Sequence, residues 1–213
     1  ILYPLIYVLS CSFSDPLLVV QSKITFLPMQ PTLVAYQRVF RNELIMTGYQ
    51  NTLFYTLLGT ALNVAVTTMM AYPLSRHDFA ARRPITMLTA FTMLFSGGMI
   101  PTFLVVKNLG LIDTVWSLVL PGLVSPWNMF IMKNYFQTSI PTELYEAASI
   151  DGADNFHLLR SVVLPLSAPI VAVMVLYYGV AHWNSYFNAL LYLRDRTRYP
   201  LQLVLRSFFS ASQ

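Results

Sequence analysis

Five long stretches of the chain contain no Asp, Glu, Lys or Arg and are rich in Leu, Met, Phe, Val and Tyr. They span residues 1–14, 44–75, 84–106, 114–132 and 161–193, with 14, 32, 23, 19 and 33 residues. A helix needs roughly 20 apolar residues to cross the hydrocarbon layer of a bilayer, so four stretches suffice for one crossing each. None shows the alternation of a lipid-facing strand. The pattern therefore predicts an all-α, polytopic bundle of membrane helices.

The elements expected from this pattern begin with a helix that ends near Ser12. A mixed polar stretch follows, with a short interfacial helix near Leu33–Phe40. The four crossings are expected at about Asn51–Leu74, Pro84–Val106, Val115–Phe136 and Ser161–Leu193.

Composition supports a membrane protein and excludes several other classes. Hydrophobic residues make up 56% of the chain and charged residues 10%, with a mean hydropathy of +0.57, whereas soluble domains carry about 25% charged residues. The net charge is +4, and the basic residues form no stripe with interleaved aromatics, so nucleic-acid binding is not indicated. The single cysteine, Cys11, and the scattered His residues show no metal-ligand spacing. No catalytic residues, cofactor or metal site are predicted.

Charge alone leaves the orientation in the membrane open. Lys and Arg are enriched in cytoplasmic loops. If the loops 76–83 and 133–160 both face the cytoplasm, five basic residues lie on that side and eight on the other. The positive-inside rule therefore does not decide between the two orientations.

Two glycines interrupt the third stretch. Gly97 and Gly98 have two readings: small residues that permit close helix packing in lipid, or a broken helix that lines a pathway. Close packing is the favoured interpretation. Asn63, midway along the first complete crossing, is expected to bond across helices rather than to touch a substrate.

A polar segment before the last stretch carries the signals of two short helices joined by a fixed turn. Pro141 suits a first helical turn, and Glu143 lies where the helix dipole favours a carboxylate. Gly152 is expected to end this helix in the left-handed conformation, and Asp154 to cap a second helix over Asn155–Arg160. These residues predict an elbow of two helices on the membrane surface. On these signals alone it is either a docking element or a solvated loop.

The same segment resembles the EAA loop of ATP-binding-cassette (ABC) importer permeases. That motif reads EAA, three residues, Gly, nine residues, then Ile-x-Leu-Pro. Here it reads Glu146-Ala147-Ala148, then Gly152, then Val162-x-Leu164-Pro165, with Val162 in place of Ile. The runs at 95–101 and 107–111 and Trp183-Asn184 are similar to the carbohydrate-uptake branch, the MalG-like and LplC-like permeases. The resemblance covers nearly the whole chain.

The resemblance implies a type I importer permease of the MetI-like kind, in the bacterial cytoplasmic membrane. Members have six crossings and both termini in the cytoplasm, and this chain is expected to carry about five. The implied docking surface for a cytoplasmic ABC ATPase comprises Glu146, Ala147, Ala148, Asp151, Gly152, Leu164 and Pro165. The chain has no Gly-x4-Gly-Lys-Ser/Thr phosphate loop, so ATP hydrolysis belongs to that partner and the chain is not expected to be an enzyme.

Further partners follow from the same resemblance. They are a second, related permease in a heterodimer, an extracellular solute-binding lipoprotein or periplasmic protein, and membrane lipid. Residues 1–12 then end the first transmembrane helix, 13–47 form an extracellular loop, and 48–193 form the core with helices 2–5 and the cytoplasmic coupling loop 137–160. Residues 194–213 are expected to be an extracellular segment before a sixth helix that this chain lacks.

Polar and aromatic residues at the end of the last stretch are the remaining candidates. His182, Trp183 and Asn184 either line a translocation pathway, form an interfacial aromatic belt, or touch the solute-binding protein. The belt is favoured over the pathway.

The expected function is transport of a sugar or oligosaccharide. Permeases for amino acids, polyamines or phosphate share the EAA loop and stay open as alternatives. An ion-coupled transporter or channel is disfavoured, because the five apolar stretches contain no Asp, Glu, Lys or Arg and no inverted repeat is found. A membrane-embedded enzyme lacks paired His or carboxylates.

Overall fold

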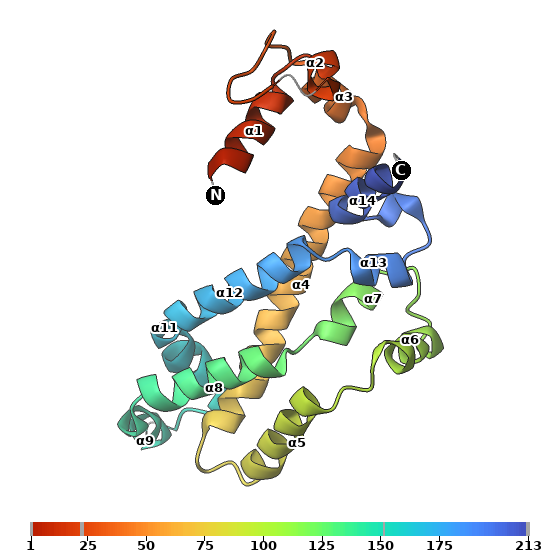
Figure 1. Cartoon of the computed structure of the whole chain (residues 1–213). Helices are drawn as coiled ribbons and strands as arrows, with labels where there is room; N and C mark the ends of the chain where they lie inside the picture. The colour runs from red at the N-terminus through yellow and green to blue at the C-terminus, as the bar shows by residue number, and fades with distance from the viewer. Residues whose placement is uncertain (1, 22–23, 151, 212–213) are drawn as a thin grey trace.

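The computed structural model describes residues 2–21, 24–150 and 152–211, and within this part the regular elements are all helices, without strands. The chain folds into helices arranged along one long central helix (Figure 1). In chain order they are α1 (Leu2–Ser12), α2 (Pro16–Val20), α3 (Val34–Arg41), α4 (Glu43–Ser75), α5 (Arg82–Leu94), α6 (Met99–Asn108), α7 (Trp116–Val119), η1 (Leu120–Gly122), α8 (Pro126–Ser139), α9 (Thr142–Ile150), α10 (Asn155–Leu158), η2 (Leu159–Val163), α11 (Leu164–Leu166), α12 (Ala168–Trp183), α13 (Phe187–Tyr192), η3 (Arg196–Arg198) and α14 (Leu201–Ala211).

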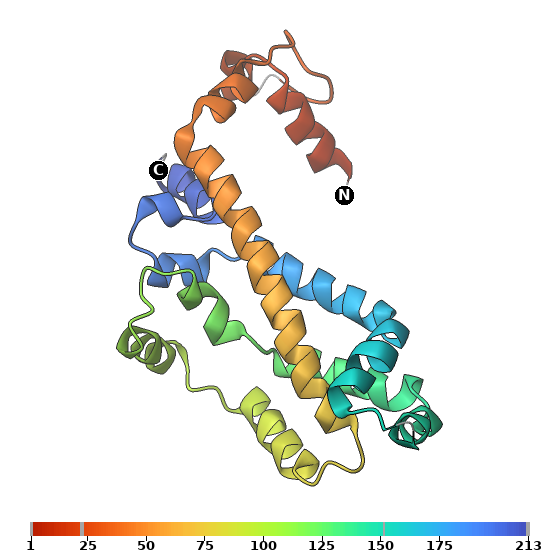
Figure 2. The same cartoon turned by 180° about the vertical axis from the view of Figure 1, so that it is seen from behind.

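The central helix α4 runs most of the length of the molecule in both views (Figures 1 and 2). The Asn42 side chain caps it by accepting from Leu44 N and Ile45 N at 3.0 and 3.3 Å, and Glu43 lies in its first turn, where the dipole favours a carboxylate. The helix ends at Ser75, two residues after Pro73. Its 33 residues make it about 50 Å long at 1.5 Å per residue. The helix predicted at Asn51–Leu74 is confirmed and extends further in both directions.

The main hydrophobic core lies where α8 and α12 cross the C-terminal half of α4. Met129, Met132 and Phe136 of α8 and Met174 of α12 are each at most 1% exposed there. Val163 of η2 is also fully buried in this cluster. The helix that precedes α12 is thereby fixed to the bundle.

A second, smaller cluster joins α7, α13 and α14 to the N-terminal half of α4 around Tyr55. Hydrogen bonds reinforce it: Asn51 Nδ2 donates to the Thr197 and Tyr199 carbonyls at 2.7 and 3.1 Å, and Leu201 N donates to Thr52 Oγ1 at 2.8 Å. Residues far apart in sequence thus form the second end of the bundle.

The crossing predicted at Pro84–Val106 is broken. α5 ends at Leu94, α6 begins at Met99, and the two are bent by 118° relative to each other. Gly98 has a φ of +84°, and no atom lies within 4 Å of where its Cβ would be. The interpretation as close packing is therefore wrong for Gly98 within the described residues, because this glycine supplies backbone freedom at a helix break. For Gly97 the interpretation stays a prediction.

The other two predicted crossings are also interrupted. Residues 123–125 separate η1 from α8, next to Pro121 and Pro126. The helix over Asn155–Leu166 is bent by 84° from α12, and residues 184–186 separate α12 from α13. Within the described residues one helix is long and apolar enough to span a membrane, or up to three if each bent pair counts as one span.

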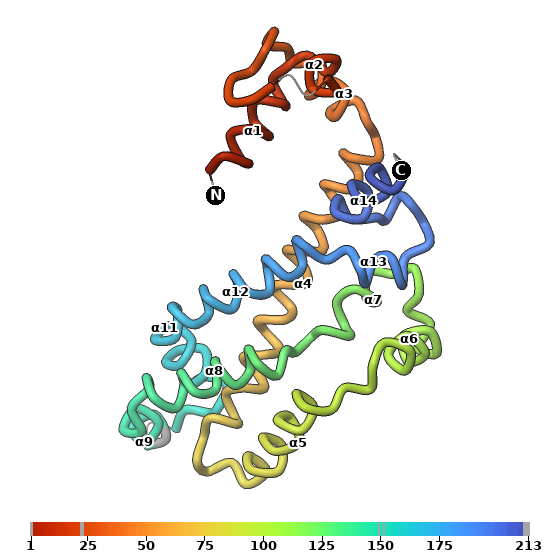
Figure 3. Tube along the Cα trace, in the orientation of Figure 1, coloured from red at the N-terminus to blue at the C-terminus, as the bar shows by residue number. Residues whose placement is uncertain are grey.

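The two ends of the bundle are formed by different helices. The trace places α9 and the turn between α4 and α5 at one end, and α14 and α1–α3 toward the other (Figure 3). The helices predicted to end near Ser12 and to lie near Leu33–Phe40 are confirmed as α1 and α3. The boundaries assigned to cytoplasmic and extracellular segments stay predictions.

Candidate functional site

The elbow starts with α9, which forms as its sequence predicts. Pro141 directly precedes the helix, and Leu144 N donates to the Pro141 carbonyl at 3.3 Å. Glu143 lies in the first turn. The helix is nine residues long, too short to be stable alone, so it depends on packing against the bundle.

The turn after α9 has the predicted geometry. Gly152 adopts a φ of +75°, and Ala153 N donates to the Ala148 carbonyl at 2.9 Å, the bond that closes a Schellman motif. Asp154 then caps the next helix by accepting from His157 N at 2.6 Å. Both predictions are confirmed; Asp151 lies outside the described residues.

The second arm of the elbow runs through α10, η2 and α11. The π-helical turn of η2, Leu159–Val163, directly precedes Leu164-Pro165, and proline removes a backbone donor that a regular helix would use. Leu164 packs against the main core, whereas Pro165 is exposed. The arm does not continue straight into α12, because the chain bends by 84° at the fully buried Ser167.

One side of α9 faces the bundle and the other faces outward. Ile140, just before the helix, is 4% exposed, and Tyr145 and Ala148 pack against the main core. Glu146 and Ala147 are exposed. The first two residues of the EAA sequence are therefore available to a partner, and the third is used for packing.

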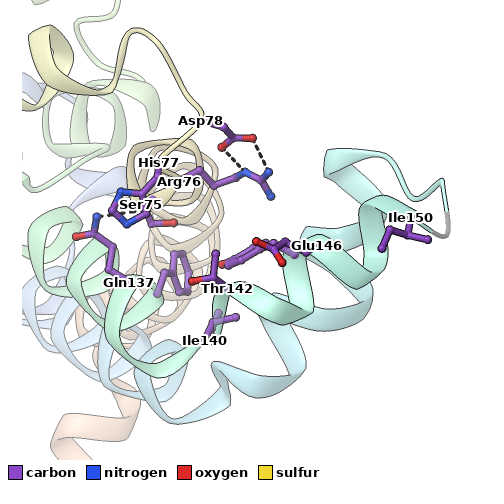
Figure 4. Close-up of a pocket in the computed structure, with 11 residues that line it drawn as sticks. Ser75, Arg76, His77, Asp78, Gln137, Ile140, Thr142, Glu146 and Ile150 are labelled. Carbon is purple, nitrogen blue, oxygen red and sulfur yellow. Dashed lines mark hydrogen bonds and ion pairs between the residues drawn. The ribbon is translucent and has the colours of Figure 1, made fainter.

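A pocket of about 410 Å³ lies between α9 and the ends of α4 and α8 (Figure 4). Glu146 and Thr142 approach it from α9, and Gln137 from α8. The residues after α4 supply Arg76 and Asp78. The pocket thus combines one carboxylate of the elbow with the charged end of the central helix.

An ion pair organises the charged side of this pocket. Arg76 Nε and Nη2 donate to the two carboxylate oxygens of Asp78 at 2.9 and 2.6 Å, a bidentate arrangement. These bonds lower the pKa of the Asp78 carboxyl and raise the pKa of the Arg76 guanidinium. The Arg76 Cζ atom also lies 4.9 Å from the centre of the Tyr145 ring. Sequence analysis missed both Arg76 and Tyr145, since no spacing rule links a residue after α4 to one in α9.

A second polar cluster lies inside the bundle around Asn63. Asn63 Nδ2 donates to the Gly122 and Leu123 carbonyls at 2.7 and 3.1 Å, and Asn63 Oδ1 lies 2.9 Å from His182 Nε2. Because Asn63 accepts through this oxygen, His182 Nε2 must carry the proton. The predicted interhelical role of Asn63 is confirmed. His182 is half-buried and bonded to Asn63 of α4; a belt or pathway role for it stays a prediction.

A glycine at position 59 of α4 makes room for the His182 imidazole. A Cβ on Gly59 would lie 2.5 Å from His182 Nε2, so only glycine fits there without moving the imidazole. Nearby, the Tyr178 hydroxyl lies 2.7 Å from Thr67 Oγ1 and accepts from Ser125 N at 3.1 Å. These contacts link α4, α12 and the break before α8.

The remaining candidates do not join this cluster. Trp183 packs edge-on against Tyr49 with ring centres 5.9 Å apart, and Asn184 Nδ2 donates to the Val180 carbonyl of its own helix at 2.9 Å. A pathway or belt role for these two residues, and a pathway role for Gly97 and Gly98, stay predictions. No group of three or more His, Cys, Asp or Glu among the described residues could hold a metal ion.

Comparison with known proteins places this arrangement in a family. Residues 63–205 match the family described as binding-protein-dependent transport system inner membrane component. The chain belongs to this family. The match includes the elbow, Asn63 and His182, and it begins within α4. The protein is therefore an inner membrane component of a transport system, a permease subunit and not an enzyme.

Individual relatives agree with the family. The permease is 44% identical, over 98% of its length and 73% of the relative's, to the polygalacturonan/rhamnogalacturonan transport system permease protein YtcP of Bacillus subtilis. It is 43% identical to Protein LplC of the same organism over 95% of its length and 68% of that protein.

A solved structure shares the fold. A chain in the crystal structure of a bacterial ABC transporter involved in the import of the acidic polysaccharide alginate matches the permease with a TM-score of 0.96. The two chains are 36% identical, and the match covers all of the permease and 75% of that chain. The type I ABC importer permease fold expected from the sequence is confirmed.

Proposed function

We propose that this permease moves a sugar or oligosaccharide across the cytoplasmic membrane and that an ABC ATPase drives it by docking on the elbow formed by α9 and α10. The observation that carries the proposal is the two-sided geometry of α9. Glu146 and Ala147 are exposed, while Ala148 and Tyr145 pack against the core. A partner that pushes on the exposed face therefore acts on a helix held by the bundle.

The charge at this end of the molecule supports a cytoplasmic docking face. The loop after α4 and the first turn of α5 carry Arg76, Arg82 and Arg83 within eight residues, and they lie at the same end of the bundle as α9 (Figure 1). Short loops rich in Lys and Arg are retained in the cytoplasm. If this end of the bundle faces the cytoplasm, a cytoplasmic ATPase has access to Glu146.

The substrate class follows from the relatives' names. Besides YtcP, a relative in Bacillus subtilis that is 34% identical over 85% of this chain is a maltodextrin transport system permease protein, and the structural neighbour belongs to an importer of a polysaccharide. All of these solutes are carbohydrates, which favours a sugar over an amino acid, a polyamine or phosphate.

Three further partners complete the proposed transporter. A second, related permease and lipid cover the apolar surface of α5 and α6, where Leu94, Phe95 and Ile100 are 81%, 63% and 68% exposed. A solute-binding protein delivers the sugar from outside. The permease contributes the membrane path and the ATPase contributes hydrolysis.

The test is reconstitution of the permease with its ATPase, second permease and solute-binding protein in proteoliposomes. Uptake is measured for oligogalacturonides, maltodextrins, arabino-oligosaccharides, an amino acid mixture, spermidine and phosphate. We expect ATP-dependent uptake of at least one of the sugars and of none of the other solutes. Uptake confined to the amino acids, spermidine or phosphate would contradict the proposed substrate class.

A further inference from the structure

A contact outside the EAA sequence joins the elbow to the end of α4. We propose that Arg76 is a positioning residue that passes movement of α9 to α4 through the ring of Tyr145. The proposal rests on the proposed docking of an ATPase at Glu146. It adds a second connection between the docking helix and the bundle, separate from the covalent one through α10 and α11.

The contacts fix the Arg76 side chain over the elbow. Its guanidinium carbon lies 4.9 Å from the centre of the Tyr145 ring, within the range of a cation–π interaction. Asp78 holds the guanidinium through two hydrogen bonds, and the Arg76 side chain is only 18% exposed. Arg76 Nη1 also lies 3.5 Å from the hydroxyl of Tyr72 in α4.

The backbone around Arg76 is anchored as well. Gln137, near the end of α8, donates from Nε2 to the Ser75 carbonyl at 3.3 Å. Tyr145 itself packs against the main core. The end of α4, the end of α8 and one face of α9 therefore form a single contact region on the wall of the pocket in Figure 4.

The covalent route from the elbow is less direct than this contact. It passes through the π-helical turn at Leu159–Val163 and then through the 84° bend at Ser167 before it reaches α12. A bend of this size at one residue weakens the transfer of a push along the chain. Arg76, in contrast, directly follows the last residue of α4, the helix against which α8, α12 and α14 all pack.

Arginine suits this position better than lysine. Its planar guanidinium can stack on an aromatic ring and donate two parallel bonds to a carboxylate at the same time. A lysine ammonium keeps the charge but loses the planar fork. The proposal therefore predicts that Arg76→Lys resembles a loss of the contact rather than a conservative change.

The experiment compares variants of the reconstituted transporter by sugar molecules moved per ATP hydrolysed, using the sugar of the panel that the wild type moves fastest. Arg76→Gln, Arg76→Lys and Tyr145→Leu should each lower this ratio about three- to tenfold, the effect that a partly desolvated cation–π contact supports. Tyr145→Phe, which keeps the ring, should stay near the wild-type ratio. Arg83→Gln is the matched control, because Arg83 is an exposed arginine seven residues later, in the first turn of α5.

If Arg76 and Tyr145 only stabilised the fold, the variants would give a different pattern of losses. Co-purification of the ATPase and the melting temperature are measured for every variant, and the Arg76→Gln/Tyr145→Leu double variant should be no worse than either single one. Any of three results would overturn the proposal. They are a wild-type ratio in Arg76→Gln and Tyr145→Leu, additive losses in the double variant, or a loss in Tyr145→Phe equal to that in Tyr145→Leu.

Failure of the proposed function gives a separate signature. If the wild-type transporter moves none of the sugars, the substrate class is wrong. The Arg76 proposal is then decided by ATP hydrolysis stimulated by the solute-binding protein. That stimulation must fall in Arg76→Gln and Tyr145→Leu and persist in Tyr145→Phe, and any other pattern overturns it.

Discussion

Asn63 shows how one side chain can hold an interrupted membrane helix in place. The break before α8 frees the Gly122 and Leu123 carbonyls, and unsatisfied backbone groups are costly at membrane depth. The Asn63 amide donates to both, and its oxygen binds His182. A single residue of α4 therefore fixes two other segments.

Gly59 tests this arrangement, because its missing side chain makes room for the imidazole. In Gly59→Ala the new Cβ would lie 2.5 Å from His182 Nε2, so the ring must move and its bond to Asn63 is lost. We expect a loss of about 1–3 kcal/mol in stability, as for other overpacked sites, seen as a lower melting temperature of the purified complex. Gly179→Ala is the control, because its Cβ would meet its nearest neighbour at an ordinary 3.7 Å. Equal melting temperatures for the two variants would argue against a fixed His182.

Glu146 is the residue whose charge we expect to matter most for coupling. It is exposed on α9 beside Ala147, and truncating one partner of a charge pair at an interface costs roughly 2–5 kcal/mol. Glu146→Ala should therefore abolish most sugar uptake while the permease still inserts and folds. Glu143→Ala, on the same helix, should retain most uptake. Normal uptake by Glu146→Ala in proteoliposomes would remove its assigned role.

At the scale of elements, the elbow is determined by local sequence signals. Pro141, Gly152 and Asp154 each act within a few residues of their own position, so sequence alone predicted the two helices and the turn between them. The same reasoning could not predict which side of α9 faces the bundle. That depends on Tyr145 and Ala148 meeting residues of α4 and α8 that are far away in sequence.

The interrupted crossings were predicted less well for a related reason. Pro121, Pro126, Gly97 and Gly98 are visible in the sequence, but a membrane helix continues through such residues whenever its neighbours satisfy the freed groups. At the break before α8 the donor is Asn63, about 60 residues earlier in the chain. Recognising the break requires knowing that contact, which spacing rules do not supply.

Gly152 allows a test of the turn with a matched pair of substitutions. Its φ of +75° costs a residue with a branched side chain about 1–2 kcal/mol, whereas asparagine visits this region more readily. Gly152→Val should lower coupled uptake and the melting temperature more than Gly152→Asn. Equal effects of valine and asparagine would show that the left-handed turn is not the reason for glycine here.

Asp113 links two loops at the far end of the bundle and gives a pH dependence. Its carboxylate accepts from Arg194 N and Asp195 N at 3.1 and 3.2 Å, and these bonds lower its pKa below the ordinary 3.8. A lowered folded-state pKa means that the stabilisation is complete above the ordinary value and disappears as the pH falls through the lower folded value.

Hydrogen exchange at the Arg194 and Asp195 amides measures this effect. Protection, corrected for the intrinsic rate, should be constant above about pH 5 and should fall as the carboxyl protonates at lower pH. Asp113→Asn keeps an acceptor that does not titrate, so its protection should not change over the same range. An identical pH profile in both proteins would rule out Asp113 as the cause.

At the scale of the whole molecule, the central helix α4 connects two ends with different tasks. One end carries the elbow, Arg76 and the pocket between α9 and α8. The other end carries α13 and α14 around Tyr55, and the Asn63–His182 cluster lies between them. A displacement of the elbow can therefore reach the interior of the bundle through one continuous helix.

The most direct test of this account is a cross-link between the exposed face of α9 and the ATPase. Ala147→Cys is introduced in a Cys11→Ser background, which removes the single native cysteine, and the complex is treated with a short cross-linker in inside-out and right-side-out vesicles. We predict a cross-link to the ATPase, and labelling of the introduced cysteine by a membrane-impermeant reagent only in inside-out vesicles. Labelling from the outer face, with no cross-link to the ATPase, would contradict the account.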